Sequence, residues 1–303
     1  MPSPKRERLL VPDSEIIVVL DTAPARELAY DDAPPSWVTT FAQMAQDGYS
    51  FSLADGAIAE LLAQRHRDAL SAAQCLRIVE RLTPVLNPEL PVLLGKRDLG
   101  GMLHLSKTPL DEREAFDLSQ LGWEEFKRCT DPANNQESPE WALQEERDEW
   151  IGFFAGWQQV LDEINAEAPS EPLEPLEPLE PLDLQLLTIP MLDLMAQAQD
   201  QRASSTPPLS TRNHLKNRYF WRQFVRKQKS KGAYDPTSPK KRNDGIDADL
   251  FGYLTLPAFV VTRDKGFFEG LADIQSFQKA WLYRPEALAS EWLKGSKPIP
   301  SWR

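Results

Sequence analysis

Length and composition place this chain among globular proteins. It has 303 residues, of which 41% are hydrophobic and 9% are aromatic, a balance that disordered chains lack. The net charge of -12 argues against general affinity for nucleic acids, although the charge is unevenly spread. Residues 212–242 hold eleven Lys or Arg residues against one acid, Asp235, and residues 111–183 carry most of the acidic balance.

Membrane insertion and zinc binding are not expected. The longest aliphatic run, residues 16–20, is far below the roughly 20 residues that cross a bilayer, and residues 1–10 have no apolar segment behind their charges. Cytoplasmic residence without a membrane partner is therefore the expectation. The two cysteines and three histidines show neither disulfide nor zinc spacing, so any metal would be held by oxygen ligands.

The first predicted element is a strand in "DSEIIVVLDT", which ends on Asp21. Its continuous β-branched run is typical of a parallel strand that is buried on both faces. "AIAELL" then has helical spacing and carries Glu60. A further helix is predicted at about residues 71–82, and "ELPVLLGKRDLGGML", residues 89–103, is predicted to hold a second strand that runs into a glycine turn.

The middle of the chain, residues 101–208, is predicted to be an acidic and mostly α-helical insertion. Ser138 and Pro139 make a good start for a long helix with a broad apolar stripe, which favours a core face over a docking face for a partner. The stripe consists of Trp150, Phe153, Phe154, Trp157, Val160, Leu161 and Ile164. "SEPLEPLEPLEPLD", residues 170–183, is predicted to be an extended linker, and the alternative is a peptide ligand for another domain. A helix is expected at residues 184–201.

A basic helix is predicted to begin near Ser210. Phe220, Trp221 and Phe224 lie on one face of this helix, and several cations lie on another. Together with the next cations along the chain, these are predicted to hold a nucleic-acid backbone, and the alternative is an ordinary solvated face. The predicted set is Arg218, Arg222, Arg226, Lys229, Lys240, Lys241 and Arg242.

Acidic residues recur at the ends of predicted elements. Asp264 directly follows the β-branched run of "AFVVTRD", and "AWLYR" is a plausible last strand. Because the carboxyl ends of adjacent parallel strands face a common crevice, Asp21 and Asp264 are predicted to be neighbours. Asp247 stands in the first turn of a helix, where negative charge is tolerated, and Glu60 would be a fourth acid.

Converging carboxylates need a neutralising partner. At roughly 4 Å and an effective dielectric constant near 20, each pair costs about 4 kcal/mol. A shared proton would relieve this repulsion and give a general acid and base pair. A hard divalent cation would relieve it too, and the neighbouring cationic helix favours phosphate chemistry. Each acid alone is equally typical of a turn or a helix cap.

The segments "VLDT", "AIAELL", "NDGIDADLFGYL" and "VVTRDKGF" together resemble the four acidic motifs of PIN-domain nucleases. This resemblance implies an α/β fold with a central parallel sheet flanked by helices, formed by residues 13–100 and 209–303 and interrupted by the insertion. It implies one or two Mg²⁺ or Mn²⁺ ions, with Asp244 or Asp249 as a further ligand and Thr262 in support. The implied metal-binding and catalytic acids are Asp21, Glu60, Asp247 and Asp264.

The family consists of metal-dependent ribonucleases, of which many are toxins paired with a protein antitoxin. The resemblance implies hydrolysis of phosphodiester bonds, with Asp21 and Asp264 as ligands and Glu60 positioning or deprotonating the water. Single-stranded RNA is the expected substrate, although the residues do not distinguish RNA from DNA, and a homodimer is a further possibility. The alternative is a catalytically silent nucleic-acid-binding or regulatory module. A phosphatase of the haloacid dehalogenase type would need a second Asp where this chain has Ala23.

Overall fold

The computed structural model describes residues 15–95, 112–134, 139–167, 212, 214–229, 234–241, 243–272 and 274–301. The chain forms two compact units. Unit 1 consists of Met1–Glu140, Gly252–Lys265 and Phe277–Arg303, and unit 2 consists of Trp141–Phe251 and Gly266–Ser276. Each unit is described by itself. In neither unit does a helix among the described residues have the length and apolar character needed to cross a membrane.

The described elements alternate between strands and helices at both ends of the chain. The strands are β1 (Ile16–Leu20), β2 (Tyr49–Ala54), β3 (Val92–Leu93), β4 (Ala258–Val261) and β5 (Leu282–Tyr283). The helices before the middle of the chain are α1 (Thr22–Glu27), α2 (Ser36–Gln46), α3 (Asp55–His66), α4 (Ala72–Leu82), α6 (Glu112–Arg128) and α7 (Glu140–Glu167). The later helices are α10 (His214–Lys229), η2 (Pro239–Lys241), α11 (Asp244–Tyr253), α12 (Lys265–Gly270), η3 (Phe277–Trp281) and α13 (Pro285–Leu293).

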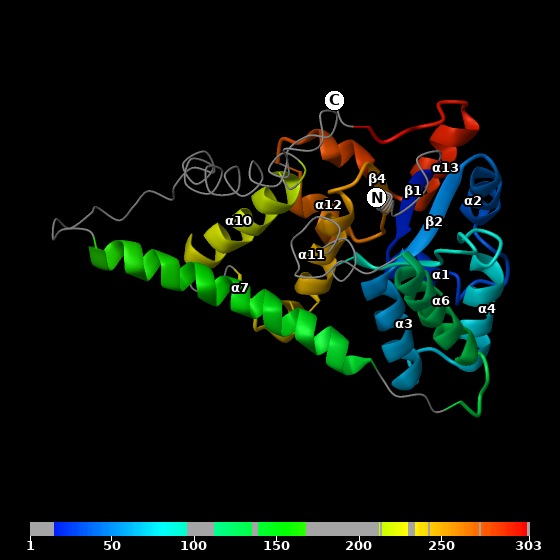
Figure 1. Cartoon of the computed structure of the whole chain (residues 1–303), viewed down its shortest axis with the longest axis horizontal. Helices are drawn as coiled ribbons and strands as arrows, with labels where there is room; N and C mark the ends of the chain where they lie inside the picture. The colour runs from blue at the N-terminus through cyan, green and yellow to red at the C-terminus, as the bar shows by residue number, and fades with distance from the viewer. Residues whose placement is uncertain are drawn as a thin grey trace, which may run out of the picture. The chain divides into compact units, whose positions relative to one another are not determined.

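Unit 1 is built on a five-stranded sheet with the order β3-β2-β1-β4-β5, in which every pair is parallel. The predicted α/β architecture with a central parallel sheet is thereby confirmed. The chain moves outward from β1 through β2 to β3 and then returns to β4 on the other side of β1 (Figure 1). The order of the strands therefore reverses between β1 and β4, and such switch points are where open parallel sheets bind ligands.

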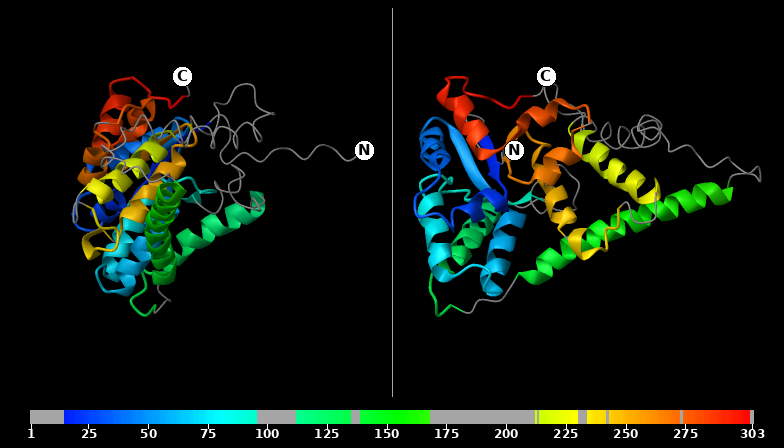
Figure 2. Two further views of the ribbon diagram at one scale, coloured as in Figure 1. Left: turned by 90° about the vertical axis from the view of Figure 1, so that its left-hand side faces the viewer. Right: turned by 180° about the vertical axis from the view of Figure 1, so that it is seen from behind.

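Helices flank the sheet in two groups. In the first group, α1 packs on α3 and α4, and α6 packs on α3, α4 and β3. The second group consists of α2 and α13, which lie side by side, with α2 also against β2. Both groups can be followed in Figure 1 and, from behind, in Figure 2. Although α6 falls within the predicted insertion, it belongs to unit 1 because its apolar side covers the edge of the sheet.

Strand β2 was not among the predicted elements, because its sequence "YSFSLA" alternates serine with apolar residues. Every residue of β2 is nevertheless buried. The Ser50 hydroxyl accepts a hydrogen bond from the Asn87 side-chain amide at 2.6 Å, and the Ser52 hydroxyl donates to the Leu90 carbonyl at 2.6 Å. Buried hydroxyls cost little when they are hydrogen-bonded in this way. Glu60 consequently follows the second strand of the chain and not the first.

The core of unit 2 is a cluster of aromatic side chains from α7 and α10. The rings of Trp150 and Phe154 meet edge to face at 5.0 Å, and those of Trp150 and Phe220 at 5.1 Å. Phe224 stacks on Phe154 at 6.4 Å. The described part of the α7 stripe is therefore core, as predicted. This packing also explains why α10 shares a unit with α7, although the predicted ranges put these two helices in different domains.

Several predicted features lie outside the described residues. They are the Ser138 cap, the linker at residues 170–183, the helix at residues 184–201 and Arg242. The side chains of Trp157, Val160, Leu161, Ile164, Trp221 and Lys229 also lie outside them.

Tyr253 joins the carboxyl ends of β2 and β3 within unit 1. Its hydroxyl lies 2.8 Å from the Asp55 carboxylate and 2.8 Å from the Leu93 carbonyl. The Asp55 carboxylate also accepts from the Gly95 N–H at 2.8 Å. A Cβ atom on Gly95 would lie 2.8 Å from the Tyr253 hydroxyl, so only glycine allows this close approach.

We expect Tyr253→Phe to lower the free energy of unfolding by about 1–3 kcal/mol, because removal of the hydroxyl takes away the one proton shared by the Leu93 carbonyl and the Asp55 carboxylate and the acceptor of the Asp55 N–H. Tyr30→Phe is the matched control, since Tyr30 is 55% exposed. Urea unfolding of the two variants measures the difference. Equal stabilities would show that the Tyr253 hydroxyl contributes nothing.

Candidate functional site

The carboxyl ends of β1 and β4 place Asp21 and Thr262 in direct contact. Asp21 caps the start of α1, its N–H donates to the Val261 carbonyl at 3.0 Å, and it is only 8% exposed. The Thr262 N–H donates to the Tyr283 carbonyl at 3.0 Å, which continues the pairing of β4 with β5. With its backbone held in this way, Thr262 donates its hydroxyl to Asp21 Oδ2 at 2.6 Å.

Asp264 belongs to the same cluster. Its backbone N–H donates to the Thr262 hydroxyl oxygen at 3.0 Å, and its negative charge acts on Asp21. The structure therefore brings together Asp21, Thr262 and Asp264. Asp21 and Asp264 were predicted to be neighbours at the ends of adjacent strands, and the resemblance implied Thr262 in support. The Thr262 hydroxyl thus accepts a hydrogen bond from Asp264 and donates one to Asp21.

Thr22 connects Glu60 to this cluster, and it was not among the predicted site residues. Its backbone N–H donates to Asp21 Oδ1 at 2.6 Å, and its hydroxyl donates to Glu60 Oε2 at 2.5 Å. Thr22 is buried, and Glu60 lies one turn and a half into α3. The threonine that follows the aspartate in "VLDT" was the available signal, because a hydroxyl beside a carboxylate can orient it.

The carboxyl group of Asp21 is buried, and its neighbours only partly offset the cost of a negative charge there. Burial raises the pKa of the Asp21 carboxyl above its ordinary value of 3.8, and the charge of Asp264 raises this pKa further. The hydrogen bonds from Thr262 and from the Thr22 backbone act in the opposite direction. Both of these donors are neutral groups, so the negative charge remains without a cationic partner among them.

The chemistry of these donors fits a hard divalent cation. Carboxylate and hydroxyl oxygens are the ligands that Mg²⁺ and Mn²⁺ prefer, and Mg²⁺ keeps several waters while it binds only one or two carboxylates. Asp21 and Asp264 supply two. Within the described ranges, no group of three or more His, Cys, Asp or Glu side chains is close enough to hold a metal ion. A site here would therefore take most of its ligands from water and substrate.

Helix α11, which carries three of the predicted acids, begins in unit 2. Asp244 and Asp247 both lie in the first turn of α11. The carboxylate of Asp244 accepts from the Tyr234 hydroxyl at 2.9 Å and lies 3.7 Å from Lys241 Nζ. Tyr234 in turn accepts from the Trp150 indole N–H at 2.8 Å. Asp244 thus has a structural role within unit 2, and the approach of Asp247 and Asp249 to Asp21 stays a prediction.

The predicted cations of unit 2 differ in their contacts within the protein and in their exposure. Arg222 donates to the Gly270 carbonyl, and Lys241 lies near Asp244 and over the Tyr234 ring at 5.9 Å. Arg218 is half-buried. Arg226 and Lys240 are exposed, although Arg226 also donates to Gln223 at 3.2 Å. Among the described members of the set, these two are the exposed residues, and we expect them to be available to a phosphate backbone.

We expect Asp21→Asn to remove a pH dependence from the stability of the metal-free protein. Because the pKa of Asp21 is raised, its favourable contribution to stability is complete below about pH 3.8 and is lost as the pH rises through the folded-state pKa. Asparagine has no charge to bury, but it offers only one acceptor oxygen to the Thr22 N–H and the Thr262 hydroxyl. The melting temperature of the variant in EDTA, relative to that of the wild type, should therefore rise from acidic to neutral pH by about 2–4 °C for each kcal/mol of charge burial relieved. The exposed Asp31→Asn is the control, and a difference in melting temperature that does not change with pH would contradict the electrostatic argument.

Comparison with known proteins adds no relative. A scan against protein-family models, a search of curated proteins and a search of solved structures each found no match for this chain. The inference of function therefore depends on the residues of the site and their geometry.

Proposed function

We propose that this chain is a divalent-metal-dependent nuclease that hydrolyses phosphodiester bonds, with RNA as its substrate. The observation that supports this most is the buried carboxylate of Asp21, which lies beside Asp264 at a strand switch point and has only neutral hydrogen-bond donors. A buried charge of this kind is costly unless a cation neutralises it. The resemblance of four acidic segments to PIN-domain nucleases supports the same reading.

The residues of the cluster have different proposed roles in metal binding and in proton transfer. Asp21 and Asp264 would hold Mg²⁺ or Mn²⁺, and Thr262 keeps the Asp21 carboxylate in one orientation through its 2.6 Å hydrogen bond. When bound, the ion supplies an acidified water and stabilises negative charge on the leaving oxygen. Glu60, held by the Thr22 hydroxyl, would accept a proton from the attacking water. Asp247 is the further acid of the predicted set.

Recognition of the nucleic acid is proposed for the cations of unit 2. Arg226 and Lys240 are exposed and would contact phosphates directly, whereas Arg222 is also used within the fold. Each phosphate contact on a single strand contributes about 0.7 to the salt dependence of binding. Because the protein is acidic as a whole, such a local basic surface would direct a polyanion to one part of the molecule.

A catalytically silent nucleic-acid-binding module is the second candidate. The observation that favours it is that both carboxylate oxygens of Asp21 already accept hydrogen bonds within the protein. These oxygens retain further lone pairs, however, so the hydrogen bonds orient the carboxylate without preventing coordination. A growth-limiting or defence role with a protein antitoxin belongs to the same proposal and rests on the resemblance alone.

Asp264→Asn should reduce cleavage of single-stranded RNA by about 100-fold or more, since even residues that only orient metal ligands contribute 10- to 100-fold. EDTA should abolish the wild-type cleavage, and added Mg²⁺ or Mn²⁺ should restore it. Asp117→Asn on α6 is the matched control, because the Asp117 side chain is 73% exposed. Cleavage that persists in EDTA, or that Asp264→Asn leaves unchanged, would exclude the metal-dependent mechanism.

Reversal of the exposed cations, Arg226→Glu with Lys240→Glu, should weaken RNA binding and lower the slope of log K against log salt concentration by about 1.4. Binding is measured in EDTA, so that cleavage does not interfere. Arg113→Glu with Arg128→Glu on α6 controls for the change of -4 in net charge, since these two side chains are 91% and 61% exposed. If both variants bind RNA with the same affinity and salt slope, the basic surface of unit 2 is not the binding site.

A further inference from the structure

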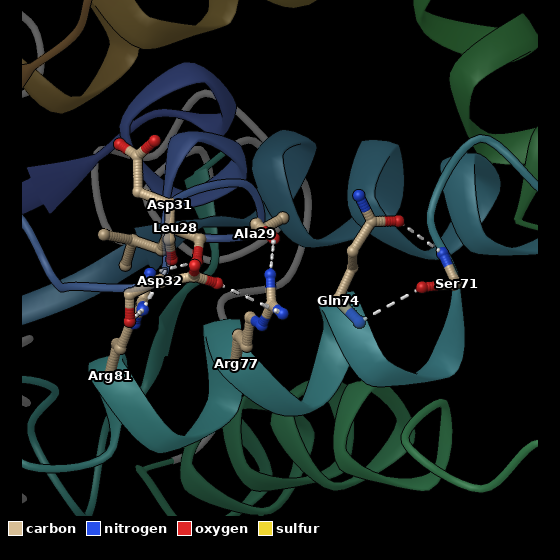
Figure 3. Close-up of polar contacts among 8 residues, drawn as sticks. All are labelled: Leu28, Ala29, Asp31, Asp32, Ser71, Gln74, Arg77 and Arg81. Atoms are coloured by element: carbon tan, nitrogen blue, oxygen red, sulfur yellow. Dashed lines mark hydrogen bonds and ion pairs between the residues drawn. The ribbon is translucent and has the colours of Figure 1, made fainter.

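Two arginines of α4 donate hydrogen bonds to backbone carbonyls directly after α1, the helix whose first residue is Thr22. Arg81 donates to the Leu28 carbonyl at 2.7 Å, and also to the carbonyls of Asp31 and Asp32, both at 2.7 Å. Arg77 donates to the Ala29 carbonyl at 3.3 Å. These carbonyls belong to Leu28, which caps the end of α1, and to the chain that follows it, and Figure 3 shows the two arginines reaching them from the same side of α4.

Helix α4 is a firm support for these arginines. Its N-terminus has a complete capping box, in which the Ser71 hydroxyl accepts from the Gln74 N–H and the Gln74 side chain accepts from the Ser71 N–H (Figure 3). Its other face packs on α6. The capping box satisfies backbone N–H groups in the first turn of α4, which stabilises the helix that carries both arginines.

A third arginine contacts α1 from the segment that follows β4. Arg263 lies between the site residues Thr262 and Asp264, and its Nε atom is 2.5 Å from the Glu27 carboxylate of α1. This contact is an ion pair without hydrogen-bond geometry. Arg263 also pairs with Glu286 of α13.

The length of α1 makes these contacts relevant to the site. The helix has six residues, and at a rise of 1.5 Å per residue it is about 9 Å long. Its first residue is Thr22, which orients both Asp21 and Glu60. With one planar group, Arg81 binds the carbonyl of the C-cap residue Leu28 and the carbonyls of Asp31 and Asp32 farther along the chain. A shift at this end of so short a helix would therefore move the carboxylates at its start.

We propose that Arg81 is a positioning residue for the carboxylate cluster, and that it acts through α1 with the support of Arg77 and Arg263. Arg81 does not contact the carboxylate of Asp21, and its role is to keep Thr22 in the place where it orients Asp21 and Glu60. The effect on cleavage rests on the proposed nuclease function, whereas the effect on α1 does not.

The test compares Arg81→Met, which keeps the apolar stem and removes the donors, with Arg81→Lys, which keeps one charged donor group. Arg113→Met is the matched control, because it removes an exposed arginine from another helix. We expect Arg81→Met to weaken Mn²⁺ binding in calorimetry by about tenfold, in the range of residues that orient metal ligands. The kcat for RNA cleavage should fall with little change in KM, and Arg81→Lys should restore part of both losses.

Circular dichroism first establishes that each variant is folded at the temperature of the assay. If Arg81→Met is not folded, Arg77→Met replaces it, because this change removes a longer bond to a single carbonyl. Arg77→Met should shift Mn²⁺ affinity in the same direction by a smaller factor. Wild-type Mn²⁺ affinity and kcat in the folded variant would overturn the proposal.

Hydrogen exchange separates this proposal from the nuclease proposal. The Thr22 amide donates to Asp21, so its exchange reports the geometry at the start of α1. Exchange of this amide should be faster in Arg81→Met than in Arg113→Met, by about tenfold for each 1.4 kcal/mol of lost local stability. If the wild type neither binds Mn²⁺ nor cleaves RNA, the nuclease function fails, and faster exchange would still support the positioning role. Unchanged exchange would overturn it.

Discussion

The candidate site depends on one interaction, the parallel pairing of β1 with β4. In this pairing Ile17 lies opposite Ala258, and Leu20 lies opposite Val261. The next residues along each strand are Asp21 and Thr262, which are 241 positions apart in the sequence and are joined by a hydrogen bond of 2.6 Å. The backbone ladder therefore sets the distance between the two side chains, and without it Asp264 would not share a location with Asp21. Glu60 is placed by the neighbouring pairing of β1 with β2, because α3 follows β2.

The same arrangement has an electrostatic cost. A carboxylate that is buried at the end of a central strand, with a second acid beside it, favours the protonated state. The surrounding hydroxyl and amide groups reduce this cost without removing it. Sites that are arranged in this way bind a cation more strongly as the pH rises, since the proton and the cation compete for the same oxygens. Stability of the metal-free protein and affinity for a cation therefore oppose each other at Asp21.

The division into two units also separates the proposed tasks. The carboxylate cluster is formed within unit 1, by residues at the ends of β1 and β4, at the start of α1 and in the second turn of α3. The basic helix α10 belongs to unit 2, where its apolar face packs on the aromatic side chains of α7. Some cations of that helix stabilise the fold, as Arg222 does at Gly270. A count of Lys and Arg residues in the sequence is therefore larger than the number of cations that a ligand can contact.

The sequence by itself determined the elements whose patterns report burial directly. The β-branched runs of β1 and β4, the capped helix α4 and the stripe of α7 were all predicted, because each pattern reflects a local preference or a buried face. The strand β2 was missed, since Ser50 and Ser52 are buried only through partners at Asn87 and Leu90. The hydrogen bond from Thr22 to Glu60 and the contacts of Arg81 with α1 were also missed. These features needed the tertiary structure, because the order of strands in a sheet and the donor that reaches a distant carbonyl depend on backbone pairing and packing between segments far apart in the chain.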